Sequence, residues 1–399
     1  MARKGPLIQD TKKKHGQRIE GPISSQFSKL SRNEEGNSVT LPFIDSGEKL
    51  SEHLSLDQSV KADISRVSKL YPFRISRHYL SLIKKEAPLS CPIGRQAIPC
   101  VDELTGEGEV DPLNEKGSLI TPVFIKRYPG RGVFLVSAEC AMYCRYCNRR
   151  RLVGKEWNPV LFREETLDYL EKDKEIREVI LSGGDPLMLA SEELSYILSR
   201  LKRMGKAIIR VSTRLPVVCP ERVTEAYYDL IRDNSPLWVV IHINHPNEIS
   251  PEFTAVVRRL LRSGAVLVSQ TVLLRGVNDC PHILARLFEE LVSNGIKPYY
   301  LFQLDEVAGA YHFKVRLDRG MEIMRTLRKN ISGLAMPYYA LDISGGFGKV
   351  PLDHQYIKGK RHGVVTIESP LSGFGIYDDN GTESHCMSCH ICRPVEPKI

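Results

Sequence analysis

The chain has 399 residues and a formal net charge of +8, and 42% of its residues are hydrophobic against 26% charged. These proportions exclude a collagen-like or wholly disordered chain and suit one large or two medium globular domains. No apolar run approaches the roughly 18 residues that span a membrane, and residues 1–21 lack the apolar core of a signal peptide. We therefore expect a cytoplasmic protein without a membrane partner.

The beginning of the chain is polar and basic. Residues 1–45 lack clear periodicity and include Lys12, Lys13 and Lys14, so we predict a disordered or extended basic arm there. Such an arm can bind nucleic acid, but basic tails are more often simply solvated, and we expect no nucleic-acid partner. Residues 46–130 favour an N-terminal helical segment, with 70–85 as its clearest amphipathic stretch.

Strands and helices alternate through residues 131–315. Short β-branched runs at 132–137, 178–182, 207–212, 237–243, 265–270 and 299–304 are separated by amphipathic stretches. Alternation in units of about 30 residues predicts parallel strands joined by crossover helices. Ser250 and Pro251 suit the start of one helix, and Gly264 suits its end. We predict an α/β fold with a partial (β/α)6 TIM-like barrel; an open doubly wound sheet is the alternative.

A cysteine loop directly follows the first of these strands. It carries Cys140, Cys144 and Cys147, and with no export signal such clusters indicate metal rather than disulfides. Three thiolates on one loop suit three irons of a [4Fe-4S] cluster, which leaves the fourth iron to bind a small chelating ligand. This spacing resembles that of radical S-adenosylmethionine (SAM) enzymes. A zinc knuckle short of one ligand, or three incidental cysteines, are the alternatives.

The second strand ends in a turn that carries Ser182, Gly183, Gly184 and Asp185. Glycines let backbone groups approach a ligand closely. On its own this turn is merely a tight loop between strand and helix. The resemblance to radical SAM enzymes implies that the turn receives the amine of the methionyl group of SAM.

A second glycine-rich turn, at residues 344–348, precedes Lys349. An amine presented there can form a Schiff base with a carbonyl cofactor, although composition alone favours an exposed lysine on a flexible loop. We assign this turn to a C-terminal segment at residues 316–375.

From about residue 70 to 370 the chain resembles the lysine 2,3-aminomutase family. The matching segments are YPFRISRHYLSLI, KRYPGR, CAMYCRYCNRRR, LSGGDPL, TRLPVVCPERVT, HINHPNEI, QTVLLRGVNDC and GGFGK. The resemblance implies that Lys349 holds pyridoxal phosphate as a Schiff base. It also implies cofactor contacts: Arg127, Tyr128 and Arg131 around the phosphate, and His242 and Gln270 near SAM.

The resemblance also bears on the substrate. Arg149 matches the family residue that pairs with the substrate carboxylate, a contact that guanidinium groups make bidentately. Asp305 and Asp342 match the acids that hold the distal ammonium of lysine, although either could make only structural hydrogen bonds. Tyr146 stands where other members carry His; either ring can stack on adenine, so we expect little effect.

The tail at residues 376–399 contains Cys386, Cys389 and Cys392. This spacing suits a zinc knuckle, which needs a fourth ligand; the resemblance supplies Cys280 and implies that the site joins two subunits of a homo-oligomer. His385 or His390 replacing one cysteine, and a second iron–sulfur cluster, remain alternatives.

The resulting hypothesis is an isomerase that moves the 2-amino group of L-lysine to carbon 3, giving β-lysine. It needs a [4Fe-4S] cluster, SAM, pyridoxal phosphate and an electron donor such as flavodoxin or ferredoxin. Alternatives are an aminomutase for arginine or glutamate or for a lysine of elongation factor P, a nucleic-acid-modifying radical SAM enzyme, and an electron carrier.

Overall fold

The computed structural model describes residues 31–32, 38–39, 43–353, 355–370 and 373–379. The chain divides into two units, Met1–Leu41 and Pro42–Ile399. In the first unit, β1 (Ser31–Arg32) and β2 (Ser38–Val39) form an antiparallel pair. Residues 43–45 of the predicted arm belong to the second unit, where Ile44 is buried and pairs with Ile75, so the arm is shorter than predicted. Residues 376–378 of the predicted tail belong to a strand. The rest of the arm and the cysteines of the tail lie outside the described residues. Within the described part of the chain, no helix combines the length and hydropathy of a membrane crossing.

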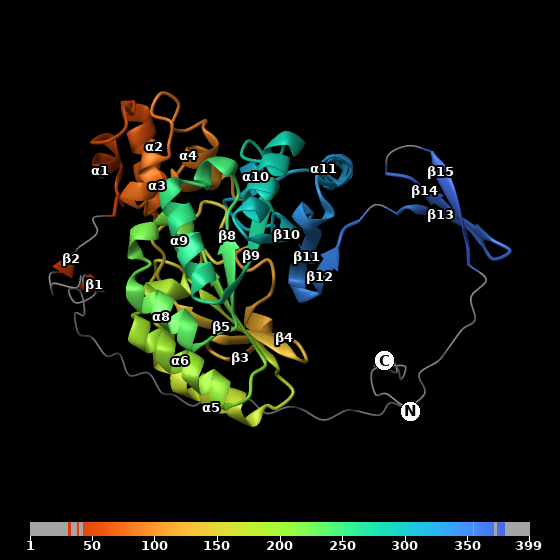
Figure 1. Cartoon of the computed structure of the whole chain (residues 1–399). Coiled ribbons are helices and arrows are strands. Elements are labelled where there is room, and N and C mark those ends of the chain that lie inside the picture. The colour runs from red at the N-terminus through yellow and green to blue at the C-terminus, as the bar shows by residue number, and fades with distance from the viewer. Residues whose placement is uncertain (1–30, 33–37, 40–42, 354, 371–372, 380–399) are drawn as a thin grey trace, which may run out of the picture. The chain divides into compact units, whose positions relative to one another are not determined.

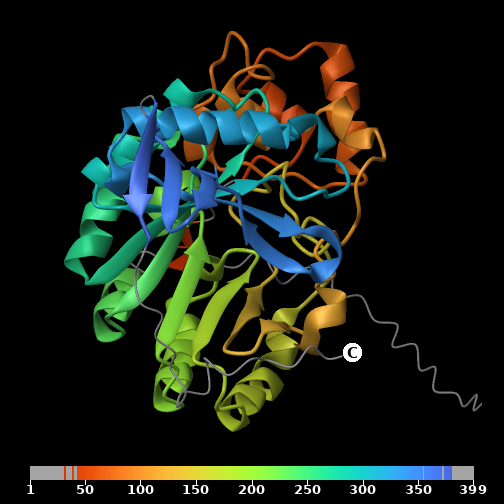
Figure 2. The same cartoon turned by 90° about the vertical axis from the view of Figure 1, so that its right-hand side faces the viewer.

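The second unit is built on a ten-stranded sheet in the order β12-β11-β10-β9-β8-β7-β6-β5-β4-β3. Strands β5 to β11 are parallel, and consecutive strands are neighbours. The strands therefore fan out in chain order in Figure 2. All six predicted strands are present: β5 (Arg131–Ser137), β6 (Glu178–Gly183), β7 (Ile208–Thr213), β8 (Leu237–His242), β9 (Ala265–Leu273) and β10 (Lys297–Gln303).

The sheet ends at β3 and β12, and no strand ladder joins these two edges in the described residues. The α/β class and the parallel sheet are thus confirmed, whereas closure into a barrel is not seen. The two ends are nevertheless linked through a loop and a side chain. Gly345 N–H donates to Pro112 O at 2.8 Å, and Lys349 N–H donates to the Tyr128 hydroxyl at 2.8 Å.

Helices run along the outer side of the parallel strands in Figure 1. They are α5 (Arg163–Lys172), α6 (Ser191–Arg203), α8 (Glu225–Asp233), α9 (Pro251–Arg262), α10 (Pro281–Ser293) and α11 (Leu317–Asn330). The single turn α7 (Leu215–Val218) follows the end of β7. In α9, Phe253, Val257 and Leu260 form a buried stripe at helical spacing. The predicted cap is confirmed, because the Ser250 hydroxyl accepts from Phe253 N–H at 3.1 Å.

The N-terminal helical segment contains α1 (Gly47–Ser51), α2 (Gln58–Ser68), α3 (Arg77–Ser81) and α4 (Pro92–Ala97). Its predicted amphipathic stretch at 70–85 is mostly not helical, because α3 starts only after its cap Ser76 and spans five residues. The segment also ends in strands rather than helix, β3 (Leu119–Thr121) and β4 (Phe124–Tyr128). They extend the sheet because the buried Phe124 pairs with Phe134 of β5.

A seventh parallel strand, β11 (Tyr338–Ile343), was not predicted. It is followed by the glycine-rich turn and by the antiparallel strand β12 (Gly348–Pro351). Gly345 and Gly346 have φ of 82° and 91°, a backbone region that side chains disfavour. The hairpin places Asp342 directly opposite Lys349. Beyond it, β13 (Ile357–Arg361), β14 (Val364–Glu368) and β15 (Phe374–Asp378) form a separate antiparallel sheet.

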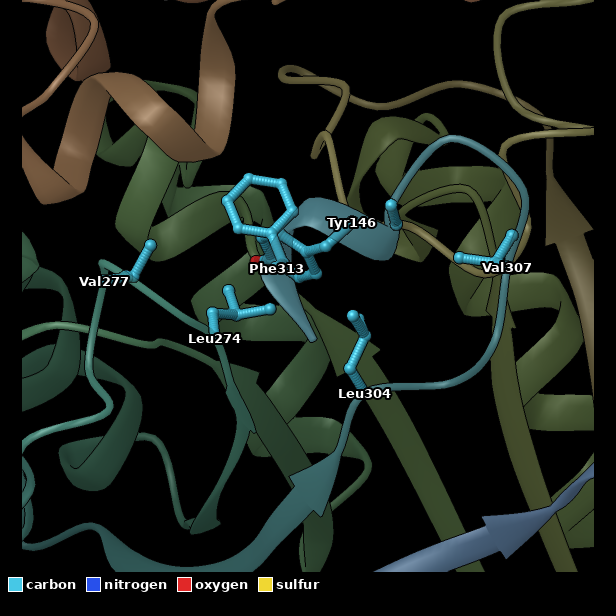
Figure 3. Packing of buried hydrophobic residues seen from close by; sticks show 7 residues of the cluster. Tyr146, Leu274, Val277, Leu304, Val307 and Phe313 are labelled. Carbon is cyan, nitrogen blue, oxygen red and sulfur yellow. The ribbon is translucent and has the colours of Figure 1, made fainter. Parts of the chain in front are cut away.

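A hydrophobic cluster lies where the loops after β9 and β10 meet the cysteine loop (Figure 3). Its buried members are Tyr146, Leu274, Val277, Leu304, Val307, Ala310 and Phe313. The rings of Tyr146 and Phe313 meet edge to face with centroids 6.2 Å apart. This packing fixes the cysteine loop against the carboxyl ends of the strands, where parallel α/β proteins place their chemistry.

Candidate active site

One cavity of about 420 Å³ lies on the inner face of the sheet, and its size is typical of ligand-binding pockets. Strand residues two positions apart line it, as expected for side chains on one face of a strand. These pairs are Ile180 and Ser182, Arg210 and Ser212, Val240 and His242, Gln270 and Val272, and Tyr300 and Phe302. Polar groups at many of these positions mean that the cavity is built for a polar ligand rather than for packing.

The cysteine loop forms one wall of this cavity. Cys140, Cys144 and Cys147 are free thiols and all three line it. Burial raises the pKa of Cys147 to about 11, and burial together with nearby acidic and thiol groups raises that of Cys140. Metal ligands must be thiolates, so this trio is stable in that form only beside strong positive charge. The donor set therefore fits the iron of a cluster.

The turn after β6 lies against the start of the cysteine loop. A side chain at Gly184 would collide with the carbonyl oxygen of Glu139, which explains the glycine. The buried Asp185 carboxylate accepts from the Thr213 hydroxyl at 2.7 Å and from Arg214 and Leu215 N–H at 2.7 and 3.0 Å. Asp185 thus ties this turn to the end of β7 and sets the shape of the cavity beside the cysteines.

His242 and Gln270 lie side by side on β8 and β9, and both line the cavity. His242 Nε2 lies 2.9 Å from the Tyr146 hydroxyl, and the two rings stack with centroids 5.6 Å apart. Burial and the positive charge of Arg214 lower the pKa of His242 to about 3. The imidazole is therefore neutral at physiological pH and acts through hydrogen bonds.

Lys349 lies in the cavity wall rather than on a solvated loop. Its Nζ donates to Asp342 Oδ2 at 2.7 Å and lies 3.9 Å from the centroid of the Phe302 ring. The Lys349 backbone N–H is held by the Tyr128 hydroxyl. This arrangement places a primary amine, the group that forms a Schiff base with a carbonyl cofactor, in the wall of the cavity.

The second acid of the predicted pair is also present. Asp305 follows β10, and its Oδ2 accepts from Asn148 Nδ2 at 2.8 Å. Burial and the neighbouring Asp342 raise the pKa of Asp305 to about 7. The structure thus brings Asp305 and Asp342 together, and a further cation in the cavity would favour the ionised form of Asp305.

Basic and aromatic side chains form another part of the wall. Arg127, Tyr128 and Arg131 all line the cavity, and the Arg131 guanidinium lies 4.0 Å from the centroid of the Tyr128 ring. Arg210 joins them and pairs with Glu178, although sequence reasoning did not single it out. The Nε atoms of Arg127 and Arg210 are buried without a hydrogen-bond partner in the described structure. These free donors fit a phosphate group.

Arg149 is anchored from two sides. Its Nη2 lies 2.8 Å from Glu115 Oε1, and its Nη1 donates to the Ser182 hydroxyl at 3.1 Å. Glu115, which sequence reasoning missed, also binds Arg151 Nη2 at 2.6 Å. Glu115 and Arg149 lie 34 residues apart in sequence, so no local motif links them. The charge of Glu115 was the only feature of the sequence that could have indicated its role.

Of the four predicted zinc ligands, the structure describes Cys280 alone. Cys280 lies at the start of α10, outside the cavity lining. Cys386, Cys389 and Cys392 lie outside the described residues. Among the residues that the structure does describe, no group of three or more His, Cys, Asp or Glu side chains is arranged to hold a single metal ion.

A parallel α/β sheet with three cysteines on the loop after its first parallel strand defines a radical SAM enzyme, and the Radical SAM superfamily model matches residues 134–288. L-lysine 2,3-aminomutase of Acetoanaerobium sticklandii is 34% identical over 88% of this chain and 85% of its own. The enzyme of that name from Methanococcus maripaludis is 35% identical (84% and 80%). Glutamate 2,3-aminomutase of Clostridioides difficile is 37% identical (80% and 76%). The chain belongs to the lysine 2,3-aminomutase family, as its motifs predicted.

Proposed function

We propose that this protein moves the 2-amino group of L-lysine to carbon 3 and so forms β-lysine, with a [4Fe-4S] cluster, SAM and pyridoxal phosphate as cofactors. One observation carries the proposal. The cysteine loop, Lys349, Arg149 and the Asp305–Asp342 pair all line a single cavity. Groups that bind a cluster, a carbonyl cofactor, a carboxylate and an ammonium are therefore close enough to act on one amino acid.

Cys140, Cys144 and Cys147 would hold the cluster. Ser182, Gly183 and Gly184 would meet the methionyl group of SAM, with Asp185 fixing the turn, and His242 and Gln270 would contact the same cofactor. When bound, cluster and SAM together supply a carbon-centred radical able to remove hydrogen from an unactivated carbon. The apolar cluster around Tyr146 keeps water from that side of the cavity.

Lys349 would hold pyridoxal phosphate, whose conjugated ring stabilises an unpaired electron next to the migrating nitrogen. The Phe302 ring beside Lys349 Nζ gives the cofactor an apolar surface to lie against. Arg127, Tyr128 and Arg131 would bind its phosphate, since guanidinium groups recognise phosphate bidentately. The unpartnered Arg127 Nε supports this placement.

Family membership alone does not choose the substrate, because one similar relative is named for glutamate. The acid pair favours lysine. A glutamate substrate would bring a third carboxylate to Asp305 and Asp342, and like charges in a buried site repel. A distal ammonium instead compensates both acids. Arg149 would pair with the substrate carboxylate and fix the other end of the molecule.

The remaining predictions stay proposals. Cys280 is a free, partly buried thiol, which is a suitable soft ligand for zinc beside Cys386, Cys389 and Cys392. The family resemblance supports a homo-oligomer joined by that site. A flavodoxin or ferredoxin as electron donor and the cytoplasm as compartment are further parts of the proposal.

The test is an anaerobic assay of the reconstituted enzyme with both cofactors and free L-lysine, with β-lysine detected by mass spectrometry. We expect β-lysine from the wild type, none from Lys349→Ala, and a strongly reduced rate from Asp342→Asn. Arginine and glutamate are offered in parallel. Product from either of them and none from lysine would refute the assignment, as would full activity of Lys349→Ala.

A further inference from the structure

Arg214 places a buried guanidinium against the cysteine loop. It directly follows β7, and its Nη1 donates to Cys144 Sγ at 2.7 Å. The same Nη1 contacts the Tyr146 hydroxyl. The Arg214 backbone N–H is fixed by Asp185 Oδ2 at 2.7 Å. None of the roles assigned above accounts for a cation bonded to a cysteine sulfur.

The far side of this guanidinium is held just as firmly. Arg214 Nη2 donates to Glu248 Oε1 at 2.5 Å and to Gln96 Oε1 at 2.8 Å. Glu248 is fully buried, and its other oxygen accepts from Asn244 and His245 N–H at 2.7 and 2.8 Å. Because these backbone hydrogen bonds fix the Glu248 carboxylate, its ion pair holds the Arg214 guanidinium in contact with Cys144 Sγ.

A fixed cation at a cysteine sulfur has a defined effect on a cluster bound there. Hydrogen bonds to the sulfurs and nearby charge set the reduction potential of an iron–sulfur centre. Reduction adds one electron, and hence one negative charge, to the cluster. A positive donor stabilises that added charge, and burial strengthens the interaction because little water screens it. Arg214 Nε is also buried without a partner in the described residues, so a further N–H remains free for an acceptor.

We propose that Arg214 is a positioning residue that holds the Cys144 thiolate and raises the reduction potential of the cluster bound by the cysteine loop. The inference rests on the proposed cluster. The electron comes from an external one-electron reductant, and no bond in the protein is broken. Glu248 serves as the counterion that keeps the guanidinium in place.

The experiment compares the reconstituted wild type with Arg214→Gln and Arg214→Lys by titration with dithionite, monitored by electron paramagnetic resonance. For Arg214→Gln we expect the equilibrium constant for reduction to fall at least about tenfold, a shift of about 59 mV to lower potential for a one-electron couple. Arg214→Lys keeps the charge and should recover part of the shift. Iron and sulfide analysis confirms equal cluster content.

Arg145→Gln is the matched control. Arg145 lies in the same loop, is 2% exposed and is paired with Glu103 at 2.6 Å, but its hydrogen bonds go to Glu103 and to the carbonyls of Tyr71 and Pro72 rather than to a sulfur. A general loosening of the loop would shift Arg145→Gln as much as Arg214→Gln. We expect the shift in Arg145→Gln to be clearly smaller, and equal shifts would overturn the proposal.

A second measurement does not depend on the folding of Arg214→Gln. Wild-type protein labelled with ¹⁵N-arginine should show weak nitrogen coupling to the reduced cluster in pulsed electron paramagnetic resonance. Absence of that coupling, or an unchanged potential in Arg214→Gln, overturns the role of Arg214 alone. A wild type that forms no four-iron centre, or whose spectrum SAM leaves unchanged, overturns the proposed function and this inference together.

Discussion

Replacing Asp305 by asparagine tests how the cavity recognises a cationic substrate. Burial and Asp342 raise the pKa of Asp305 from 3.8 to about 7. One pKa unit corresponds to about 1.4 kcal/mol, so ionising Asp305 costs on the order of 4 kcal/mol more in the empty cavity than in water. The ammonium of a bound substrate offsets this cost. Lysine should therefore bind well only when Asp305 is ionised, above about pH 7.

The assay measures kcat/KM for lysine between pH 5.5 and 7.5, because this ratio reports ionisations of the free enzyme. For the wild type we expect kcat/KM to decline as pH falls through 7, by about tenfold for each unit well below the pKa. In Asp305→Asn this decline should disappear. At pH 7.5 the variant should lose about 10- to 100-fold, because a hydrogen bond to a charged group contributes roughly 1.5–3 kcal/mol.

Glu306→Gln provides the matched control. Glu306 is the next residue in sequence, but its side chain is half exposed and paired with Lys314 at 2.5 Å. Lys314 holds the pKa of Glu306 below its usual value, so this group stays ionised across the tested range. The control should keep the wild-type profile. A wild-type kcat/KM that does not change between pH 5.5 and 7.5, or an unchanged decline in Asp305→Asn, would refute the reasoning.

Three further outcomes are expected. Because the pKa of Asp305 is raised in the folded protein, the free energy of unfolding falls as pH rises from 3.8 through about 7. Without lysine, Asp305→Asn should therefore unfold at a higher temperature than the wild type at pH 8 but not at pH 3.5. Tyr146→Phe leaves the buried partners of the hydroxyl unsatisfied, which should cost about 1–3 kcal/mol in chemical denaturation; an unchanged midpoint would contradict this. Gly184→Ala forces a collision with the backbone of Glu139 and should abolish SAM binding measured by calorimetry. At Gly205 no atom lies near an added Cβ, but φ is 72°; Gly205→Ala should therefore cost about 1–2 kcal/mol of stability and keep SAM binding.

The six central strands and their capped helices could be predicted because each is marked locally. Strands such as β6 and β8 are short apolar runs, and α9 carries its own cap at Ser250. Strand β11 carries a comparable apolar and aromatic run but was not predicted. It lies between a proline and a glycine-rich turn, both of which are typical of loops. Residues 70–85 are helical only at Arg77–Ser81, because tertiary packing overrides the helical preference of an amphipathic pattern.

The candidate site divides in the same way. The cysteine loop and the glycine turn are contiguous motifs, so the sequence was sufficient to single them out. Glu115 and Arg210 were missed because their roles arise from partners on other elements, Arg149 and Glu178. Pairings of this kind depend on strand register and loop path, and a single sequence gives no measure of either.

The hairpin of β11 and β12 places Asp342 where it can serve both the proposed cofactor, through Lys349, and the ammonium of the proposed lysine substrate. In the described structure, the cation hydrogen-bonded to Asp342 is Lys349 itself, at 2.7 Å. An amine committed to a cofactor cannot remain the full partner of Asp342, so the acid pair then needs another cation. The distal ammonium of a lysine substrate would supply this cation. The guanidinium of arginine carries the same charge, so charge alone does not exclude arginine as the substrate. If arginine binds the reconstituted enzyme as tightly as lysine, charge does not select the substrate. Selection must then come from how the shape of the cavity positions each amino acid for the reaction.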